Sequence, residues 1–192
     1  MGREFELKYR ATAEQIAAIG AKFGLFREIS METTYYDTPD RSLSARKWTL
    51  RRRFENGVSV CTLKTPHRDG GRGEWEMESH DLISAVPALC KLGAPAELES
   101  LVCNGVMEVC GARFTRLAAL MEANGCTVEL ALDRGVLLGG GKELPLCEVV
   151  VELKKGDDAA AVAFAKELAQ TFGLVPETAS KYRRALALSA QK

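Results

Sequence analysis

Charged and apolar residues alternate at every step of the segment 3–10, and this pattern predicts a β-strand with two unlike faces. Successive side chains of a strand point to opposite sides of the sheet, so one face is apolar and the other is ionised. The apolar face suits a protein core. The charged face consists of Glu4, Glu6, Lys8 and Arg10.

The same alternation recurs and predicts a chain made mostly of strands. Further strands are expected at about 26–36, 47–55, 58–65, 72–79, 107–121, 126–134 and 146–154. Thr12 and Gln15 form a capping box that starts a helix ending at Gly24, and Asp157 or Asp158 starts an Ala-rich helix that Gly173 ends. Residues 82–104 are expected to be a helical insertion, interrupted at 93–95. The tail 180–188 fits either a strand or a short helix.

The later strands also carry charges on one face and apolar residues on the other. Their charged positions are Lys47, Arg51, Arg53, Lys64, Arg72, Glu74, Glu76, Glu78, Glu129, Asp133, Glu148, Glu152 and Lys154. One interpretation is the solvated outside of an antiparallel sheet whose apolar side is covered by helices. The other is a sheet that curls into a barrel and turns its charges inward. Solvated strand faces usually mix in Thr, Ser and Gln, so the dominance of ionised groups favours the barrel.

Composition limits the kinds of function that the chain can have. A chain of 192 residues with 46% apolar and 27% charged residues is expected to form one folded domain. Its 26 Lys and Arg balance 26 Asp and Glu, so no general nucleic-acid surface is expected. The six cysteines include no C-x-x-C pair, and no apolar run approaches the ~20 residues that span a bilayer. We therefore expect a reduced, cytoplasmic protein that binds neither nucleic acid nor membrane.

A barrel lumen lined by both signs of charge suits a polyanion bound together with divalent cations. Arginine and lysine bind phosphate oxygens, and carboxylates bind hard cations such as Mg²⁺ or Mn²⁺. Triphosphate with either metal fits this description.

Short motifs follow one another in a fixed order over nearly the whole chain, beginning with Glu4-x-Glu6-x-Lys8. The later motifs are Tyr35-Tyr36-Asp37-Thr38-Pro39-Asp40, Leu50-Arg51-x-Arg53, Thr62-Leu63-Lys64, Glu74-x-Glu76, Phe114-Thr115-Arg116, Glu129 with Leu132-Asp133-Arg134-Gly135, Cys147-Glu148 and Ser180-Lys181. In these motifs the chain resembles the CYTH superfamily, the triphosphate tunnel metalloenzymes.

This resemblance implies an α+β fold: an eight-stranded antiparallel β-barrel, the triphosphate tunnel, with helices packed outside. The whole chain, 1–192, is expected to be a single CYTH domain. The pattern is most similar to the inorganic triphosphatase branch, whose CYTH domain often precedes a second, helical domain. Whether the chain is part of such a longer protein stays open.

The resemblance also implies roles for individual residues. The expected phosphate-binding residues are Lys8, Arg51, Arg53, Lys64, Arg116 and Lys181. The expected metal ligands for Mg²⁺ or Mn²⁺ are Glu4, Glu6, Asp133, Glu148 and Glu152. The residues expected to act in catalysis are Glu4, Glu6, Lys8 and Asp133. Supporting carboxylates are expected at Glu74, Glu76 and Glu129, of which the first two either orient cations across the lumen or act on a metal-bound water.

Two positions depart from the family pattern. Val150 stands where a second glutamate of a Glu-x-Glu pair is expected, which leaves the number of metal ions open. Gly111 stands where a further arginine is expected, and Arg113 lies on the opposite face from Arg116 unless the strand is bulged.

The function expected from these features is metal-dependent hydrolysis of a triphosphate, most simply inorganic tripolyphosphate to diphosphate and phosphate. The alternatives are an adenylyl cyclase of the CYTH type, a thiamine triphosphatase or a non-catalytic polyphosphate-binding module. The expected partner is a small-molecule triphosphate. The sequence indicates no obligate protein partner, and it leaves the oligomeric state open.

Overall fold

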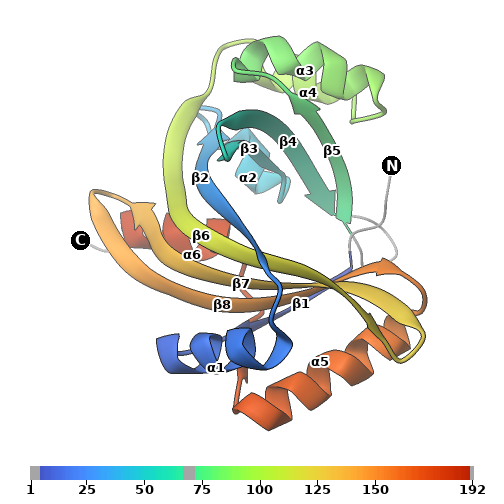
Figure 1. The fold of residues 1–192 in the computed structure, drawn as a ribbon. Coiled ribbons are helices and arrows are strands. Elements are labelled where there is room, and N and C mark those ends of the chain that lie inside the picture. Colours follow the sequence, from blue (N-terminus) through green and yellow to red (C-terminus); the bar gives the residue numbers. More distant parts are fainter. Residues whose placement is uncertain (1–4, 67–71, 191–192) are drawn as a thin grey trace.

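The computed structural model describes residues 5–66 and 72–190 and shows one strongly curved antiparallel sheet with helices (Figure 1). The expected antiparallel α+β architecture is confirmed. The sheet contains nine described strands. Their order across the sheet is β5 (Arg72–Glu78), β4 (Val58–Pro66), β3 (Thr49–Glu55), β2 (Arg27–Asp37), β6 (Met107–Ala123), β7 (Cys126–Gly139), β8 (Lys142–Lys155), β1 (Glu6–Arg10) and β9 (Val175–Pro176).

The barrel is not strictly closed, because the described parts of β5 and β1 form no ladder with each other. Part of the outer edge of β1 is instead occupied by β9, a short strand that the sequence patterns did not predict. Val175 pairs with Arg10, and the backbone N–H of Glu177 donates to the carbonyl of Lys8 at 2.8 Å. The first eight strands in sequence therefore form the expected tunnel-like sheet with an open seam.

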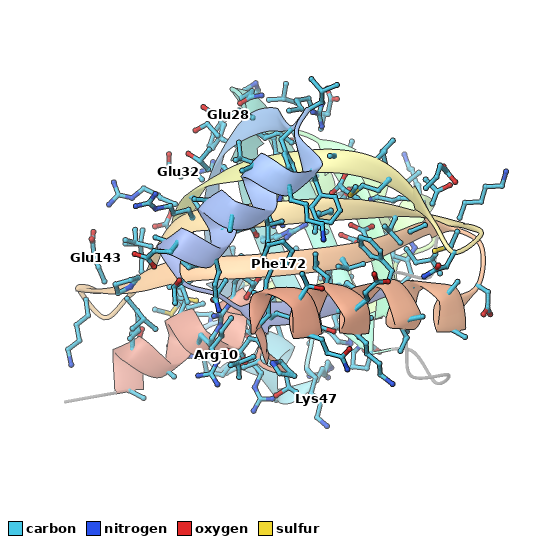
Figure 2. The ribbon with its side chains drawn as sticks, turned by 60° about the horizontal axis from the view of Figure 1, so that its bottom comes forward. Arg10, Glu28, Glu32, Lys47, Glu143 and Phe172 are labelled. Atoms are coloured by element: carbon cyan, nitrogen blue, oxygen red, sulfur yellow. The ribbon has the colours of Figure 1, made fainter. Side chains whose placement is uncertain are left out.

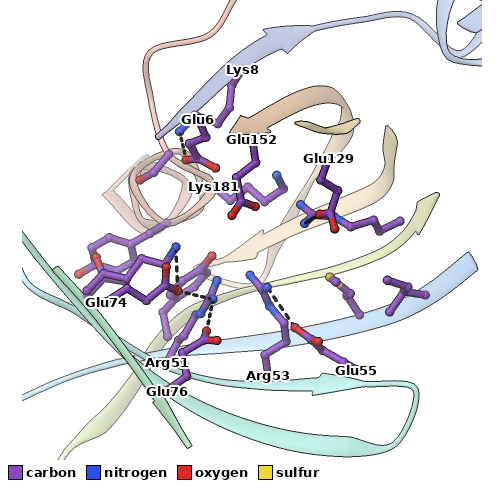
Figure 3. A pocket seen from close by; sticks show the side chains of 18 of the residues that line it. Glu6, Lys8, Arg51, Arg53, Glu55, Glu74, Glu76, Glu129, Glu152 and Lys181 are labelled. Carbon is purple, nitrogen blue, oxygen red and sulfur yellow. Dashed lines mark hydrogen bonds and ion pairs between the residues drawn. The ribbon is translucent and has the colours of Figure 1, made fainter. Parts of the chain in front are cut away.

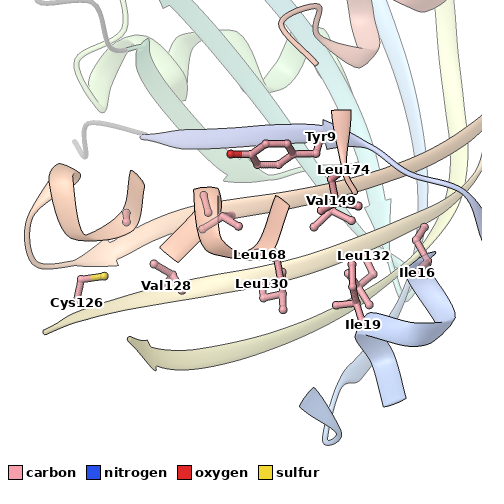
Figure 4. Close-up of a cluster of buried hydrophobic side chains, with 13 residues drawn as sticks. Tyr9, Ile16, Ile19, Cys126, Val128, Leu130, Leu132, Val149, Leu168 and Leu174 are labelled. Atoms are coloured by element: carbon pink, nitrogen blue, oxygen red, sulfur yellow. The ribbon is translucent and has the colours of Figure 1, made fainter. Parts of the chain in front are cut away.

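Two helices cover the outer face of β7, β8 and β1 (Figure 2). Helix α1 (Ala13–Phe23) begins at the predicted capping box, and α5 (Asp158–Phe172) lies between the predicted caps Asp157 and Gly173. Their apolar stripes pack on the apolar faces of the strands, as the alternation requires (Figure 4). This core includes Ile16, Ile19, Val128, Leu130, Leu132, Val149, Val151 and Leu168.

A second core lies on the outer face of β3, β4 and β5, under α2 (Ser42–Ala45), α3 (Leu82–Lys91) and α4 (Glu97–Val102). The predicted helical insertion is confirmed as α3 and α4. Trp48 and Trp75 are buried in this core, as expected from their apolar strand faces. Lys47 is different from the prediction: it precedes β3 in a left-handed turn (φ 59°) and is exposed, so it does not extend the charged row of β3.

The tail forms helix α6 (Lys181–Ala190), which packs on the inner face of the sheet. Ala185 and Leu188 lie against apolar residues of the same parity as Arg116, Asp133 and Glu148, namely Phe114, Leu137 and Leu146. The fit is close, since a Cβ at Gly139 would collide with the backbone carbonyl of Ala185. The inner face is thus apolar under most of α6 and charged beyond it. No helix in the described ranges is both long and apolar enough to span a bilayer.

Candidate active site

A cavity of about 290 Å³ opens on the charged part of the inner face. Both signs of charge line it, as predicted from strand parity (Figure 3). Its ionisable lining residues, apart from tyrosines, are Glu6, Lys8, Arg27, Arg51, Arg53, Glu55, Lys64, Glu74, Glu76, Arg116, Glu129, Glu152, Lys154 and Lys181. Every expected phosphate-binding residue is in this set.

Three carboxylates form a row across one wall. In the strand register, Glu6 of β1 lies opposite Glu152 of β8, and Glu152 lies opposite Glu129 of β7. Val150 lies opposite Lys8, in the next row, between the acidic row and the cations deeper in the cavity. On β8, therefore, Glu152 and not position 150 supplies the glutamate that lies beside Glu6. We call Glu6, Glu152 and Glu129 the carboxylate row.

The other wall carries cations held by carboxylates of neighbouring strands. Arg51 Nη2 lies 3.3 Å from Glu76 Oε1 and 3.5 Å from Glu74 Oε1, and Lys64 Nζ lies 3.1 Å from Glu74 Oε1. The hydroxyl of Thr62 also donates to Glu76 at 2.9 Å. This placement favours the role of Glu74 and Glu76 as residues that orient cations.

Arg53 has weaker compensation for its charge. Its Nε donates to the Thr33 hydroxyl at 3.0 Å, and its Nη1 lies 3.3 Å from Glu55. Burial and the positive charge of Arg51 lower the pKa of the Arg53 guanidinium to about 10, so it stays protonated at neutral pH. A cation that is destabilised by burial and by its cationic neighbour is stabilised when an anion enters.

Asp133 and Glu148 lie behind the cavity and are fully buried. Arg116 donates to both oxygens of Asp133, from Nε at 2.7 Å and from Nη2 at 2.9 Å. Lys181 Nζ, at the start of α6, lies 2.8 Å from Asp133 and also pairs with Glu148. Arg116 and Lys181, both expected to bind phosphate, are thus held in position by buried carboxylates.

The second oxygen of Glu148 accepts from Arg184, one turn along α6 from Lys181. Arg184 also lies 3.6 Å from Glu177, which in turn lies 3.8 Å from Arg10. We call Asp133, Glu148, Arg116, Lys181 and Arg184 the buried network. Through its ion pairs, this network connects helix α6 to strands β6, β7 and β8.

Burial would raise the pKa of Asp133, but Lys181 and Arg116 outweigh it and hold that pKa well below its ordinary value. Burial lowers the pKa of Arg116, and Asp133 more than reverses this effect, so the pKa of Arg116 is raised. Both groups are therefore ionised across the neutral range.

The structure brings most of the predicted site together but separates the acids into two sets. Glu6, Glu152 and Glu129 face the cavity, whereas Asp133 and Glu148 do not line it. Glu4 lies outside the described residues, and its role stays a prediction. Arg113 lies on the opposite face from Arg116 and pairs with Glu143 at 3.1 Å. A Cβ at Gly111 would stand 2.8 Å from the Thr33 carbonyl, so a larger side chain would need the backbone to shift. Of the described residues of β6, Arg116 is the one that lines the cavity.

Three cations of the site had no role assigned from sequence. Lys154 was noted on the charged face of its strand, and it pairs with Glu152 at 2.7 Å. Arg184 belongs to the tail, and helical spacing from Lys181 would have placed the two side by side. Arg27 begins a strand whose next residues on the same face, Ile29 and Met31, are apolar, so strand parity gave no charge signal.

The donor set suits a hard divalent cation. The carboxylate row offers oxygen ligands on three adjacent strands, which is the chemistry that Mg²⁺ and Mn²⁺ prefer. Across the described residues, no group of three His, Cys, Asp or Glu side chains already converges on one point. Glu6 and Glu152 instead pair with Lys8 and Lys154, so metal binding would require their side chains to move.

The sequence of the chain is similar to the CYTH domain family and to an inorganic triphosphatase. The sequence model of the CYTH domain family matches residues 2–186. An inorganic triphosphatase from Haemophilus influenzae is 27% identical over 199 residues, an alignment that covers 100% of this chain and 56% of that protein. The chain thus spans little more than half the length of this relative.

Solved structures share the fold at low sequence identity. HpAC1 from Hippeastrum, an adenylyl cyclase candidate described as having a dominant triphosphatase activity, superposes with a TM-score of 0.65 at 16% identity, covering 96% of this chain and 95% of that one. An adenylate cyclase candidate from Bacillus halodurans gives 0.64 at 18% identity, with coverage of 96% and 98%. The PH1819 protein from Pyrococcus horikoshii gives 0.62 at 24% identity, with coverage of 98% and 99%.

Proposed function

The chain belongs to the CYTH domain family, and from this premise we propose that it hydrolyses inorganic tripolyphosphate to diphosphate and phosphate with Mg²⁺ or Mn²⁺. The observation that carries the proposal is the lining of one cavity by both kinds of group: the carboxylate row on β1, β8 and β7, and arginines and lysines beside it and on the strands across from it. This arrangement suits a metal-bound polyanion better than either an anion or a metal alone.

In this proposal, Lys8, Arg51, Arg53, Lys64, Arg116 and Lys181 bind phosphate oxygens and stabilise the charge that develops on the leaving diphosphate. The arginines offer paired donors to phosphate, which fixes the orientation of the chain of phosphates. Glu6, Glu152 and Glu129 would hold the divalent ion, with Glu4 as a further candidate. When bound, the ion supplies charge neutralisation and a more acidic water.

We further propose that Asp133 and Glu148 act on cations and not directly on a metal. Their oxygens already accept from Arg116, Lys181 and Arg184, and both carboxylates are fully buried. They fix Arg116 of β6 and Lys181 at the start of α6, both of which line the cavity. This role differs from the metal-ligand role that the family resemblance implies for them.

The lining favours an inorganic substrate over a nucleotide or thiamine ester. Of the described residues that line the cavity, the aromatic ones are Tyr35 and Tyr182. Their rings pack on each other with centroids 5.2 Å apart, and both residues are buried. No exposed ring among the described lining residues is left to stack on a base, so the phosphates themselves provide the recognition.

The test is phosphate release from tripolyphosphate, ATP and thiamine triphosphate with each metal, with analysis for cyclic AMP. We expect tripolyphosphate to be the preferred substrate and Lys8→Ala to lower kcat/KM by about 100-fold, since one charged donor is lost. Arg113→Ala is the matched control because Arg113 lies outside the cavity. Binding of tripolyphosphate without turnover would support the polyphosphate-binding alternative, and cyclic AMP from ATP would support the cyclase.

A further inference from the structure

Arg27 differs from every other lysine or arginine that lines the cavity. Each of the others lies within ion-pair distance of a carboxylate, for example Lys8 with Glu6, Arg53 with Glu55 and Lys154 with Glu152. Arg27 forms no ion pair with any residue that the structure describes. It is also exposed. Its guanidinium is therefore available to an anion without displacing a carboxylate.

Arg27 stands at the open end of the cavity. It begins β2, and it lines the same cavity as Glu55 at the end of β3, Lys154 near the end of β8 and Glu6 at the start of β1. The side chains of Glu55 and Lys154 at this end are 38% exposed, whereas Arg51 and Lys181 in the interior are 9% and 10% exposed. Helix α6 covers the inner face toward the other end. Solvent, and an entering anion, thus reach the cavity from the side of Arg27. The cavity is also open along the β5 edge of the sheet, where the side chain of Glu76 is 47% exposed.

Arg27 shares a row of the inner face with Lys8, one of the predicted phosphate-binding residues. Arg27 is opposite Ala118, which is opposite Ala131, and that row continues through Val150 to Lys8. Small side chains form the floor between the two cations. The next row on the same face holds Arg116, two residues away on β6.

We propose that Arg27 is a substrate-binding residue that makes the first contact with the polyphosphate at the open end and holds it during entry. The proposal rests on the proposed function for the class of ligand, an inorganic polyphosphate. An exposed cation at the mouth of a charged cleft raises the rate of anion capture and adds a charge-assisted hydrogen bond, and both effects weaken with salt. Arg27 does not need to contact the phosphate that is cleaved.

The experiment measures tripolyphosphate binding by calorimetry in EDTA, with no turnover, and then steady-state kinetics with Mg²⁺. We expect Arg27→Gln to raise the Kd and KM for tripolyphosphate about tenfold, with kcat within twofold, because one charged contact is lost. The dependence of Kd on salt concentration should become less steep. Arg27→Lys should retain most of the affinity, and Arg113→Gln, on the outer face of β6, should match the wild type.

An unchanged Kd and salt dependence in Arg27→Gln would overturn the proposal, as would a fall in kcat with no change in KM. Wild-type protein that binds no tripolyphosphate would overturn it too. Weaker binding by Arg27→Gln in a protein that releases no phosphate would sustain the role of Arg27 while contradicting the proposed hydrolysis. The melting temperature of each variant separates these results from loss of folding.

Discussion

The carboxylate row and the buried network contain the same functional group in two different environments. Glu6, Glu152 and Glu129 face the cavity and are 21–28% exposed, whereas Asp133 and Glu148 are fully buried and are held by arginine and lysine. A carboxylate in water can exchange one cation for another at low cost, but a buried one that loses its partner becomes an uncompensated charge. Burial therefore separates acids that are able to accept a metal from acids that fix the position of cations.

The strongest test of this contrast is the same isosteric change in both regions. Asp133→Asn should lower the free energy of unfolding by roughly 3–5 kcal/mol, because it removes the buried partner of Arg116 and Lys181. Glu129→Gln, the matched change in the row, should cost less than about 1 kcal/mol. Urea unfolding measures both. Equal costs would contradict the division of the acids by burial.

Acid stability should sharpen the same comparison. The folded pKa of Asp133 lies below its unfolded value near 3.8, so its contribution is present above that value and is lost as pH falls toward the folded pKa. We expect wild-type stability to decline steadily below about pH 4. Asp133→Asn should show a flatter decline over this range. Parallel curves for the two proteins would contradict the assignment.

In the carboxylate row the main effect should be on activity. Glu152→Gln should lower turnover by about 100-fold at limiting Mg²⁺, since a ligand in register with both Glu6 and Glu129 is lost, with stability changed by less than about 1 kcal/mol. Glu143→Gln, an exposed acid of the same strand, is the control. If Glu152→Gln keeps wild-type activity and metal dependence, the row does not bind the metal.

Substitution of Arg184 tests whether the buried network holds Lys181 in position. Arg184→Gln should lower kcat/KM for tripolyphosphate about tenfold, mainly through KM, because Glu148 loses one of its two cations and Lys181 is less firmly placed. Arg184→Lys should recover part of this loss. Arg183→Gln, the exposed neighbour on the same helix, should have little effect. A loss of stability with unchanged KM would assign Arg184 a structural role alone.

Much of the fold could be predicted from the sequence because its signals are local. The capping box at Thr12 and Gln15, the caps of α5 and the strand alternation each depend on residues close together in the chain, and the structure confirms them. The turn before β3 was not predicted from the sequence. Lys47 takes a left-handed conformation that ends the charged row of β3 early, which alternation alone does not reveal.

By itself, the sequence determined which residues share a face and which kind of ligand that face suits, because side-chain direction in a strand follows directly from position. Only the tertiary structure decided which acids are buried, that α6 packs inside the sheet and that Arg27 stands at the open end. Those facts depend on register between distant strands and on the burial of one charge by another. Register placed Glu152, and not position 150, beside Glu6, because β1 pairs directly with β8 although the two strands are far apart in the sequence, and no local pattern in either strand specifies that register.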